Sequence, residues 1–257
     1  MSFPRSLAIA RSSARLLLSD PAPTIAMTAV PLVFIPFLIP GARAQLQLAG
    51  LSNASGAEQV VPGMLVLFAF LSVQTTVMLF FREHAWGTWD RLRASAARTT
   101  DIVVGKAAPS FAAQLLQCAV VLGVSTLAYG FRITGSVPAL LAVLVTFVVA
   151  LTAFGVALVA VFPTMDQAMV IGNLLGMVMA GLGGAFTPIG SLPGWAQAVA
   201  HASPAAWAID ALRGVALDGA GMVDVAPALG KLLAVAAGCL ILAGLRFRPE
   251  AVKVGTT

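Results

Sequence analysis

The spacing of the charged residues constrains this chain more than any other feature. It leaves five long stretches without an ionised side chain, at residues 21–42, 59–81, 107–131, 133–165 and 167–209. A helix needs about 20 apolar residues to cross the hydrocarbon layer of a membrane. Because 59% of the 257 residues are hydrophobic and only 10% are charged, a core of this size cannot hide the apolar surface. The sequence therefore predicts an all-α integral membrane protein and excludes a soluble enzyme, a disordered chain and a disulfide scaffold.

Six membrane-spanning helices fit these stretches and the apolar run near the C-terminus. Each of the first four stretches holds one span, and the fifth holds a span followed by a broken segment rich in Pro and Gly. The last span contains Lys231 about one turn from its expected start, where a long side chain can reach the interface. The predicted spans are residues 22–40, 60–81, 107–131, 137–162, 168–186 and 227–245.

The basic residues predict the orientation of these spans. Six spans put both ends of the chain on one side, and 11 of the 15 Lys and Arg residues fall on that side. Cytoplasmic loops carry the excess of basic residues, so we expect a plasma-membrane protein with both termini in the cytoplasm. The net charge of +5 then reflects orientation, and we expect no nucleic-acid partner.

A cleaved signal peptide is the alternative for the N-terminus, because Ala42-Arg43-Ala44 resembles a cleavage site. The apolar stretch before it is longer than the apolar region of a signal peptide, so we favour a retained first helix.

Residues 1–20 have the pattern of an amphipathic helix. Five apolar residues recur at spacings of four and three, and three arginines fall on the opposite side. Such a helix lies in the plane of the lipid headgroups, either as a passive anchor or as a lever that contacts a partner. The apolar residues are Phe3, Leu7, Ala10, Ala14 and Leu17, and the arginines are Arg5, Arg11 and Arg15.

Residues 82–106 form a polar loop that holds eight of the 25 charged residues. The loop is too polar to enter lipid and too short to be a domain. A basic loop that only sets the topology is one interpretation. However, Trp86 and Trp89 give the loop an apolar edge, and acidic residues alternate with basic ones. We therefore predict a cytoplasmic segment that engages a polar partner.

This loop resembles the signature of type-2 ATP-binding-cassette (ABC) permeases, E-x-x-x-G-T-x-E/D-R-L-x-A-S followed by G-K before the third span. The matching residues are Glu83, Gly87-Thr88, Asp90-Arg91-Leu92, Ala94-Ser95 and Gly105-Lys106. The outer sequence is also similar, at Phe186-Thr187-Pro188, Leu192-Pro193-Gly194-Trp195 and Ser203-Pro204. The resemblance covers essentially the whole chain and is nearest to the drug-resistance exporter branch.

The resemblance implies roles for two sets of residues. In that family the loop after the second span is a coupling helix seated in a cleft of the ATPase subunit, and short re-entrant helices between spans five and six close the pathway on the far side. The implied ATPase-coupling residues are Glu83, Gly87, Thr88, Trp89, Asp90, Arg91 and Arg93. The implied outer-gate residues, in the segment 187–226, are Pro188, Leu192, Pro193, Trp195 and Pro204.

The resemblance also implies partners. The chain has no G-x-x-x-x-G-K-[ST] motif, so we expect no cofactor on this chain and ATP with Mg on two copies of a separate ATPase. The other expected partners are a second permease copy or a paralogue, and membrane lipid. His84 and His201 are predicted on opposite sides of the membrane, so we expect no metal site.

Small residues recur every four positions along the fifth span, at Gly172, Gly176, Ala180 and Gly184. Such a strip allows close helix packing, either within one subunit or at a dimer seam or transport pathway. The residues predicted for a pathway or dimer surface are Met169, Asn173, Gly176, Met177 and Ala180.

The expected function is that of the membrane-spanning permease subunit of an ABC exporter. It would move an apolar or amphiphilic small molecule (a drug, an antibiotic or a lipid-like compound) out of the cytoplasm, and it would not be an enzyme alone. An ion-coupled carrier would need an ionisable residue near the middle of a span. A membrane-embedded lipid enzyme would need clustered acids or histidines at one interface. The sequence shows neither pattern.

Overall fold

The computed structural model describes residues 3–48, 50, 54–85 and 98–246, and of residues 3–4 and 83–85 the backbone alone. Every long element in this part of the chain is a helix, and six stretches are long and apolar enough to cross a membrane. The predicted all-α, six-span architecture is confirmed. The spans are Ala22–Leu48, Ala57–Arg82, Thr99–Ala128, Val137–Val161, Met165–Leu182 and Met222–Arg246.

These spans and the shorter helices follow each other along the chain. A helix is present over the predicted amphipathic segment, and its position at a membrane interface stays a prediction. The helices are α1 (Phe3–Ser19), α2 (Ala22–Leu48), α3 (Ala57–Leu71), α4 (Val73–Ala85), α6 (Thr99–Ala128), α7 (Val137–Val161), α8 (Met165–Leu182), the 3-10 turn η1 (Ile189–Ser191), α9 (Gly194–Ala200), α10 (Pro204–Leu217) and α11 (Met222–Arg246).

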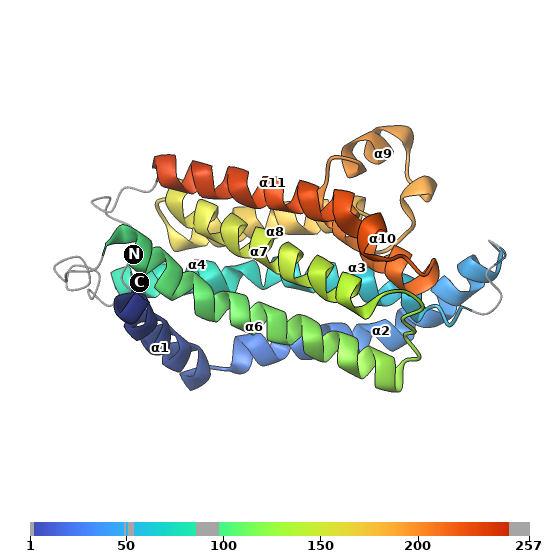
Figure 1. Ribbon diagram of the computed structural model, residues 1–257, viewed down its shortest axis with the longest axis horizontal. Helices are drawn as coiled ribbons and strands as arrows, with labels where there is room; N and C mark the ends of the chain where they lie inside the picture. Colours follow the sequence, from blue (N-terminus) through green and yellow to red (C-terminus); the bar gives the residue numbers. More distant parts are fainter. Residues whose placement is uncertain (1–2, 49, 51–53, 86–97, 247–257) are drawn as a thin grey trace.

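The long helices run along one axis and form an elongated bundle (Figure 1). Helices α3 and α7 are mostly buried, whereas α2 and α11 leave most of their surface exposed. The Phe70 ring of α3 contacts the rings of Phe147 and Phe154 on α7 edge to face, with centroids 5.7 and 6.4 Å apart. The core of the subunit therefore lies between α3 and α7, and the apolar surface of the outer helices is left for lipid or a partner.

The bundle has two distinct ends (Figure 1). At one end, here called the loop end, α4 ends, α6 begins, α11 ends and α1 lies obliquely against the bundle. At the opposite end, here called the α10 end, α9 and α10 follow α8. Helix α1 and the end of α11 thus lie at the same end, as an even number of spans requires.

Capping residues in the sequence explain where several helices begin. Ser136 accepts a hydrogen bond from the backbone N–H of Ala139 at the start of α7, and Thr164 accepts one from Gln167 at the start of α8. Ser203 caps α10 in the same way, with Pro204 as the first helical residue. Each side-chain oxygen satisfies a backbone donor that the first helical turn leaves free.

Other helix boundaries differ from the sequence prediction. Helix α6 begins at Thr99, so residues 99–106, predicted as part of the polar loop, are helical. The second span is interrupted at Ser72, whose hydroxyl donates to the Phe68 carbonyl 2.9 Å away and distorts the helix. Helix α8 ends at Leu182 rather than at residue 186, because Gly184 takes a left-handed conformation (φ +92°) just after it. Helix α11 begins at Met222, so Lys231 lies more than two turns inside it.

Candidate functional sites at the two ends of the bundle

The predicted ATPase-coupling residues lie almost entirely outside the described part of the chain. This applies to Gly87, Thr88, Trp89, Asp90, Arg91 and Arg93, and Glu83 contributes only its backbone, in the last turn of α4. The structure does describe the two helices that hold this loop, the end of α4 and the start of α6.

A buried lysine connects these two helices. Lys106, in the second turn of α6, is only 1% exposed. Its ammonium donates a hydrogen bond to the backbone carbonyl of Leu79 on α4, at 2.8 Å, and lies 5.7 Å from the centre of the Phe80 ring. A buried charge is stable only when hydrogen bonds and neighbouring groups replace its water. The ammonium therefore fixes the start of α6 to α4.

Helix α1 packs against the start of α6 on another side. The Ser6 hydroxyl donates to the Asp101 carboxylate at 3.3 Å, and the backbone N–H of Arg98 donates to the other oxygen of that carboxylate at 3.1 Å. Gly105 makes the close approach possible, because a Cβ atom there would lie 2.7 Å from Cβ of Ile9. Buried Ser6 and half-buried Ile9 thus face α6.

An ion pair joins α4 to the link between α1 and α2. The Arg82 guanidinium, at the end of the second span, lies 3.5 Å from the Asp20 carboxylate. An exposed pair like this contributes at most about 1 kcal/mol, but it lies beside the two buried contacts. We call this set of contacts the loop-end joint; it consists of Ser6, Asp20, Leu79, Arg82, Asp101, Gly105 and Lys106.

Polar side chains continue from the joint along the buried face of α6. The Gln114 amide donates to the Ser110 hydroxyl at 3.1 Å and to the Thr76 hydroxyl at 3.3 Å. Further along, the Ser72 hydroxyl lies 2.6 Å from the side-chain oxygen of Gln117. This polar face was not among the features predicted from the sequence. Its signal is the spacing of Lys106, Ser110, Gln114 and Gln117, which are four, four and three residues apart on a helix.

The predicted outer-gate residues all lie on the segment between the end of α8 and the start of α10. Pro188, Leu192 and Pro204 are half-buried, whereas Pro193 and Trp195 are exposed, Trp195 by 68%. Gln197 holds this segment together by donating to the Leu192 carbonyl at 2.7 Å, and the Trp207 indole donates to the His201 carbonyl at 2.8 Å. The structure therefore shows a compact turn followed by α9, and entry of this segment into the membrane stays a prediction.

Arg213 of α10 connects three elements at the α10 end. One guanidinium nitrogen donates to the Gly184 carbonyl at 2.7 Å and to the Gln59 carbonyl of α3 at 3.1 Å. Partial burial lowers the pKa of Arg213 to about 10, while the nearby Asp210 carboxylate opposes that shift. The side chain is still a cation at neutral pH. Arg213 is one of the four basic residues expected on the outer side, and it also lies in an outer sequence, Asp210-Ala211-Leu212-Arg213-Gly214, that resembles the permease family.

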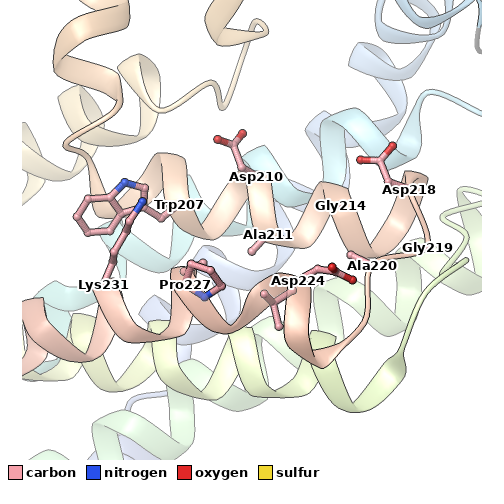
Figure 2. A pocket seen from close by; sticks show the side chains of 12 residues that line it. Trp207, Asp210, Ala211, Gly214, Asp218, Gly219, Ala220, Asp224, Pro227 and Lys231 are labelled. Carbon is pink, nitrogen blue, oxygen red and sulfur yellow. The ribbon is translucent and has the colours of Figure 1, made fainter.

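A polar pocket of about 580 Å³ lies between α10 and α11 (Figure 2). Its lining includes Asp210, Asp218 and Asp224, and the Lys231 ammonium lies 5.4 Å from the centre of the Trp207 ring. Asp224 already accepts a hydrogen bond from the backbone N–H of Gly221. Among the described residues, no group of three His, Cys, Asp or Glu side chains is arranged to hold a metal ion.

The residues predicted for a pathway or dimer surface divide between two faces of α8. Met177 is exposed, and Met169 and Asn173 are half-buried. Gly176 and Ala180 are buried within the chain, and a role for them in a pathway or a dimer surface stays a prediction. Gly176 lies against Phe70, and Gly172 lies against Leu158. The strip of small residues therefore packs within one subunit, which was the other interpretation of the sequence.

Bacterial permeases are among the known proteins that are similar to this chain. The chain is 27% identical over 179 residues to the probable multidrug ABC transporter permease YbhR of Escherichia coli (strain K12), a match that covers 69% of this chain and 49% of the relative. It is also 27% identical over 187 residues to the linearmycin resistance permease protein LnrN of Bacillus subtilis (strain 168), covering 72% of this chain and 48% of the relative. The chain thus spans about half the length of these curated relatives.

A match to a whole family extends over most of the chain. The family model described as "ABC-2 type transporter" matches residues 7–217, from α1 to the end of α10. The matched region includes Arg213 and every residue of the loop-end joint except Ser6. It also includes the segment that carries the signature resemblance. The chain is a multi-pass membrane protein that belongs to the ABC-2 type transporter family.

Proposed function

We propose that this chain is the membrane-spanning permease subunit of an ATP-driven exporter, which moves an apolar or amphiphilic small molecule out of the cytoplasm. Family membership and the names of the two bacterial relatives, one a multidrug permease and one a linearmycin resistance permease, support this proposal. The chain supplies the pathway, and a separate ATPase supplies the energy. The complex lies in the plasma membrane, with both chain ends in the cytoplasm.

The loop-end joint is the main structural support for a mechanism in which the loop transmits movement from the ATPase to the membrane helices. The loop that bears the permease signature connects α4 to α6, and Lys106 fixes these helices to each other within two turns of the loop. Asp101 and Gly105 attach α1 to the same point. A force applied to the loop therefore moves α1, α4 and α6 together. The polar contacts among Thr76, Ser110 and Gln114 extend this connection further into the bundle.

The partners follow from this mechanism. Two copies of the ATPase bind ATP and Mg and engage the loop through Glu83, Thr88, Trp89, Arg91 and Arg93. A second copy of this chain, or a paralogue, completes the pathway. The segment with Pro188, Leu192, Pro193, Trp195 and Pro204 closes it on the far side.

Uncoupling variants test the proposal. In a complex of this chain with its ATPase, reconstituted in vesicles, Glu83→Gln and Arg91→Gln should preserve membrane insertion and assembly but lower the number of molecules exported per ATP hydrolysed. The matched control is Arg43→Gln. Arg43 is an exposed arginine near the C-terminal end of α2, away from the loop. The readouts are phosphate release and the export of a panel of lipophilic dyes and antibiotics. Failure of this chain to copurify with any ATPase, or wild-type export by both uncoupling variants, would contradict the proposal.

A further inference from the structure

An apolar groove of about 440 Å³ lies at the loop end, between α6, α7 and α11. Its sides include Val103 and Val104 from α6, Val156 from α7 and Leu240 from α11. The volume lies within the range of small-molecule sites. Leu240 is 50% exposed, and neighbouring Leu245 is 78% exposed. Because these side chains lie on the apolar outer surface of the bundle, the groove opens toward lipid.

Two arginines lie next to lining residues of the groove in the sequence. Arg98 directly precedes Thr99, which lines the groove, and Arg246 follows Gly244, another lining residue, by two positions. Both arginines are exposed, and neither forms an ion pair with a carboxylate among the residues that the structure describes. Asp101, the acidic residue nearest to Arg98 in the described sequence, is fully buried and accepts hydrogen bonds from the Ser6 hydroxyl of α1 and from the backbone N–H of Arg98. The apolar groove thus has two exposed arginines close in sequence to its lining residues.

We propose that this groove binds an anionic phospholipid, with an acyl chain between α6 and α11 and the phosphate between Arg98 and Arg246. Basic pockets between membrane helices attract anionic headgroups, and each basic residue near the surface contributes about 1 kcal/mol, or about fivefold in binding. Thr99 and Thr100 also line the groove, and a threonine hydroxyl can donate a hydrogen bond to a phosphate oxygen. A bound lipid would fill the space between α11 and the start of α6.

Photolabelling of the full chain tests this site. The chain is reconstituted in nanodiscs of phosphatidylcholine that contain a trace of phosphatidylglycerol with a diazirine on one acyl chain. Labelling is mapped by mass spectrometry and compared with that by the matching phosphatidylcholine probe. We expect the phosphatidylglycerol probe to label residues 99–104 and 240–244 at least about fivefold more strongly. The double variant Arg98→Gln, Arg246→Gln should remove this preference. Arg132→Gln, an exposed arginine at the α10 end, should keep it.

A second variant blocks the groove without disturbing the fold. A Cβ atom at Gly244 would meet no other atom within 4 Å, and the same is true at Gly238 on the same helix. Gly244→Leu should fill the groove and abolish labelling there, whereas Gly238→Leu, outside the groove, should not. Any one of three results would overturn the proposal. The first is equal labelling by both probes, and the second is unchanged labelling in the arginine double variant. The third is displacement of the probe by a lipophilic dye but not by excess phosphatidylglycerol. The assay uses neither ATPase nor transport, so its outcome is independent of the proposed export function.

Discussion

The ammonium group of Lys106 donates a hydrogen bond to the backbone carbonyl of Leu79 inside the bundle, across a distance of 2.8 Å. The two residues lie on the helices that flank the signature loop, 27 positions apart in the sequence. The contact occurs in an almost fully buried environment beside the Phe80 ring. The buried ammonium group therefore holds the start of α6 against α4.

The sign of the charge at position 106 should decide whether the joint forms. Lys106→Glu would place a carboxylate beside a carbonyl oxygen in a buried site and should lower the free energy of unfolding by about 3 kcal/mol or more. Lys106→Met removes the charge and its desolvation cost together, so we expect a change within about 1 kcal/mol. Thermal unfolding in detergent measures both effects.

The matched control is Lys231→Glu, because Lys231 is exposed and contacts only the face of Trp207 among the described contacts. It should change the melting temperature far less than Lys106→Glu. Similar losses at the two positions would show that position 106 has no special environment.

A glycine at the joint should be intolerant of a single methyl group. Gly105→Ala would bring a Cβ atom to 2.7 Å from Cβ of Ile9 and 3.0 Å from the Ser6 carbonyl, so α1 must move away from α6. We expect a loss of about 1 to 3 kcal/mol and faster proteolysis of α1. Gly123→Ala on the same helix meets no atom within 4 Å and should be neutral or slightly stabilising, because alanine favours the helix. Equal protease resistance of α1 in the two variants would contradict the close packing.

The sequence predicts the spans well where local signals coincide with the ends of uncharged stretches. The fourth span was predicted at residues 137–162 and is observed at Val137–Val161, because Ser136 caps its start and Pro163 follows its end. The sequence prediction differs from the structure at residues 99–106, which were expected to lie in a polar loop because they include charged side chains. Asp101 and Lys106 are buried because α1 and α4 supply their hydrogen-bond partners. Such partners come from distant segments and cannot be read from local composition.

The outer basic residue Arg213 should resist replacement by lysine. One guanidinium nitrogen of Arg213 donates to two carbonyls, those of Gly184 and Gln59. A lysine side chain ends in a compact ammonium and cannot reproduce the planar donor geometry of the guanidinium. We expect Arg213→Lys to cost about 1.5 to 3 kcal/mol, the contribution of one charged hydrogen bond. Arg132→Lys, at an exposed position of the same end, should cost less than about 0.5 kcal/mol. Equal melting temperatures for the two variants would show that the Arg213 contacts do not hold α10 to α3.

One added methyl group on α8 should have different effects if the small residues pack within the subunit and if they form a dimer seam. A Cβ atom at Gly176 would lie 2.9 Å from Cβ of Phe70, and Phe70 is fixed in the core by the ring of Phe147. Gly176→Ala should therefore lower the stability of the single subunit by about 1 to 3 kcal/mol. Gly181→Ala, on the same helix with no atom within 4 Å, should not.

Unfolding of the detergent-solubilised chain and its oligomeric state by light scattering should be measured together. If the small residues pack within the subunit, Gly176→Ala lowers the melting temperature at every protein concentration and leaves the oligomeric state unchanged, because the strained contact lies inside one chain. If they instead formed a dimer seam, the variant would dissociate the dimer, and its melting temperature would depend on concentration by mass action. That second result would overturn the placement of Gly176 against Phe70.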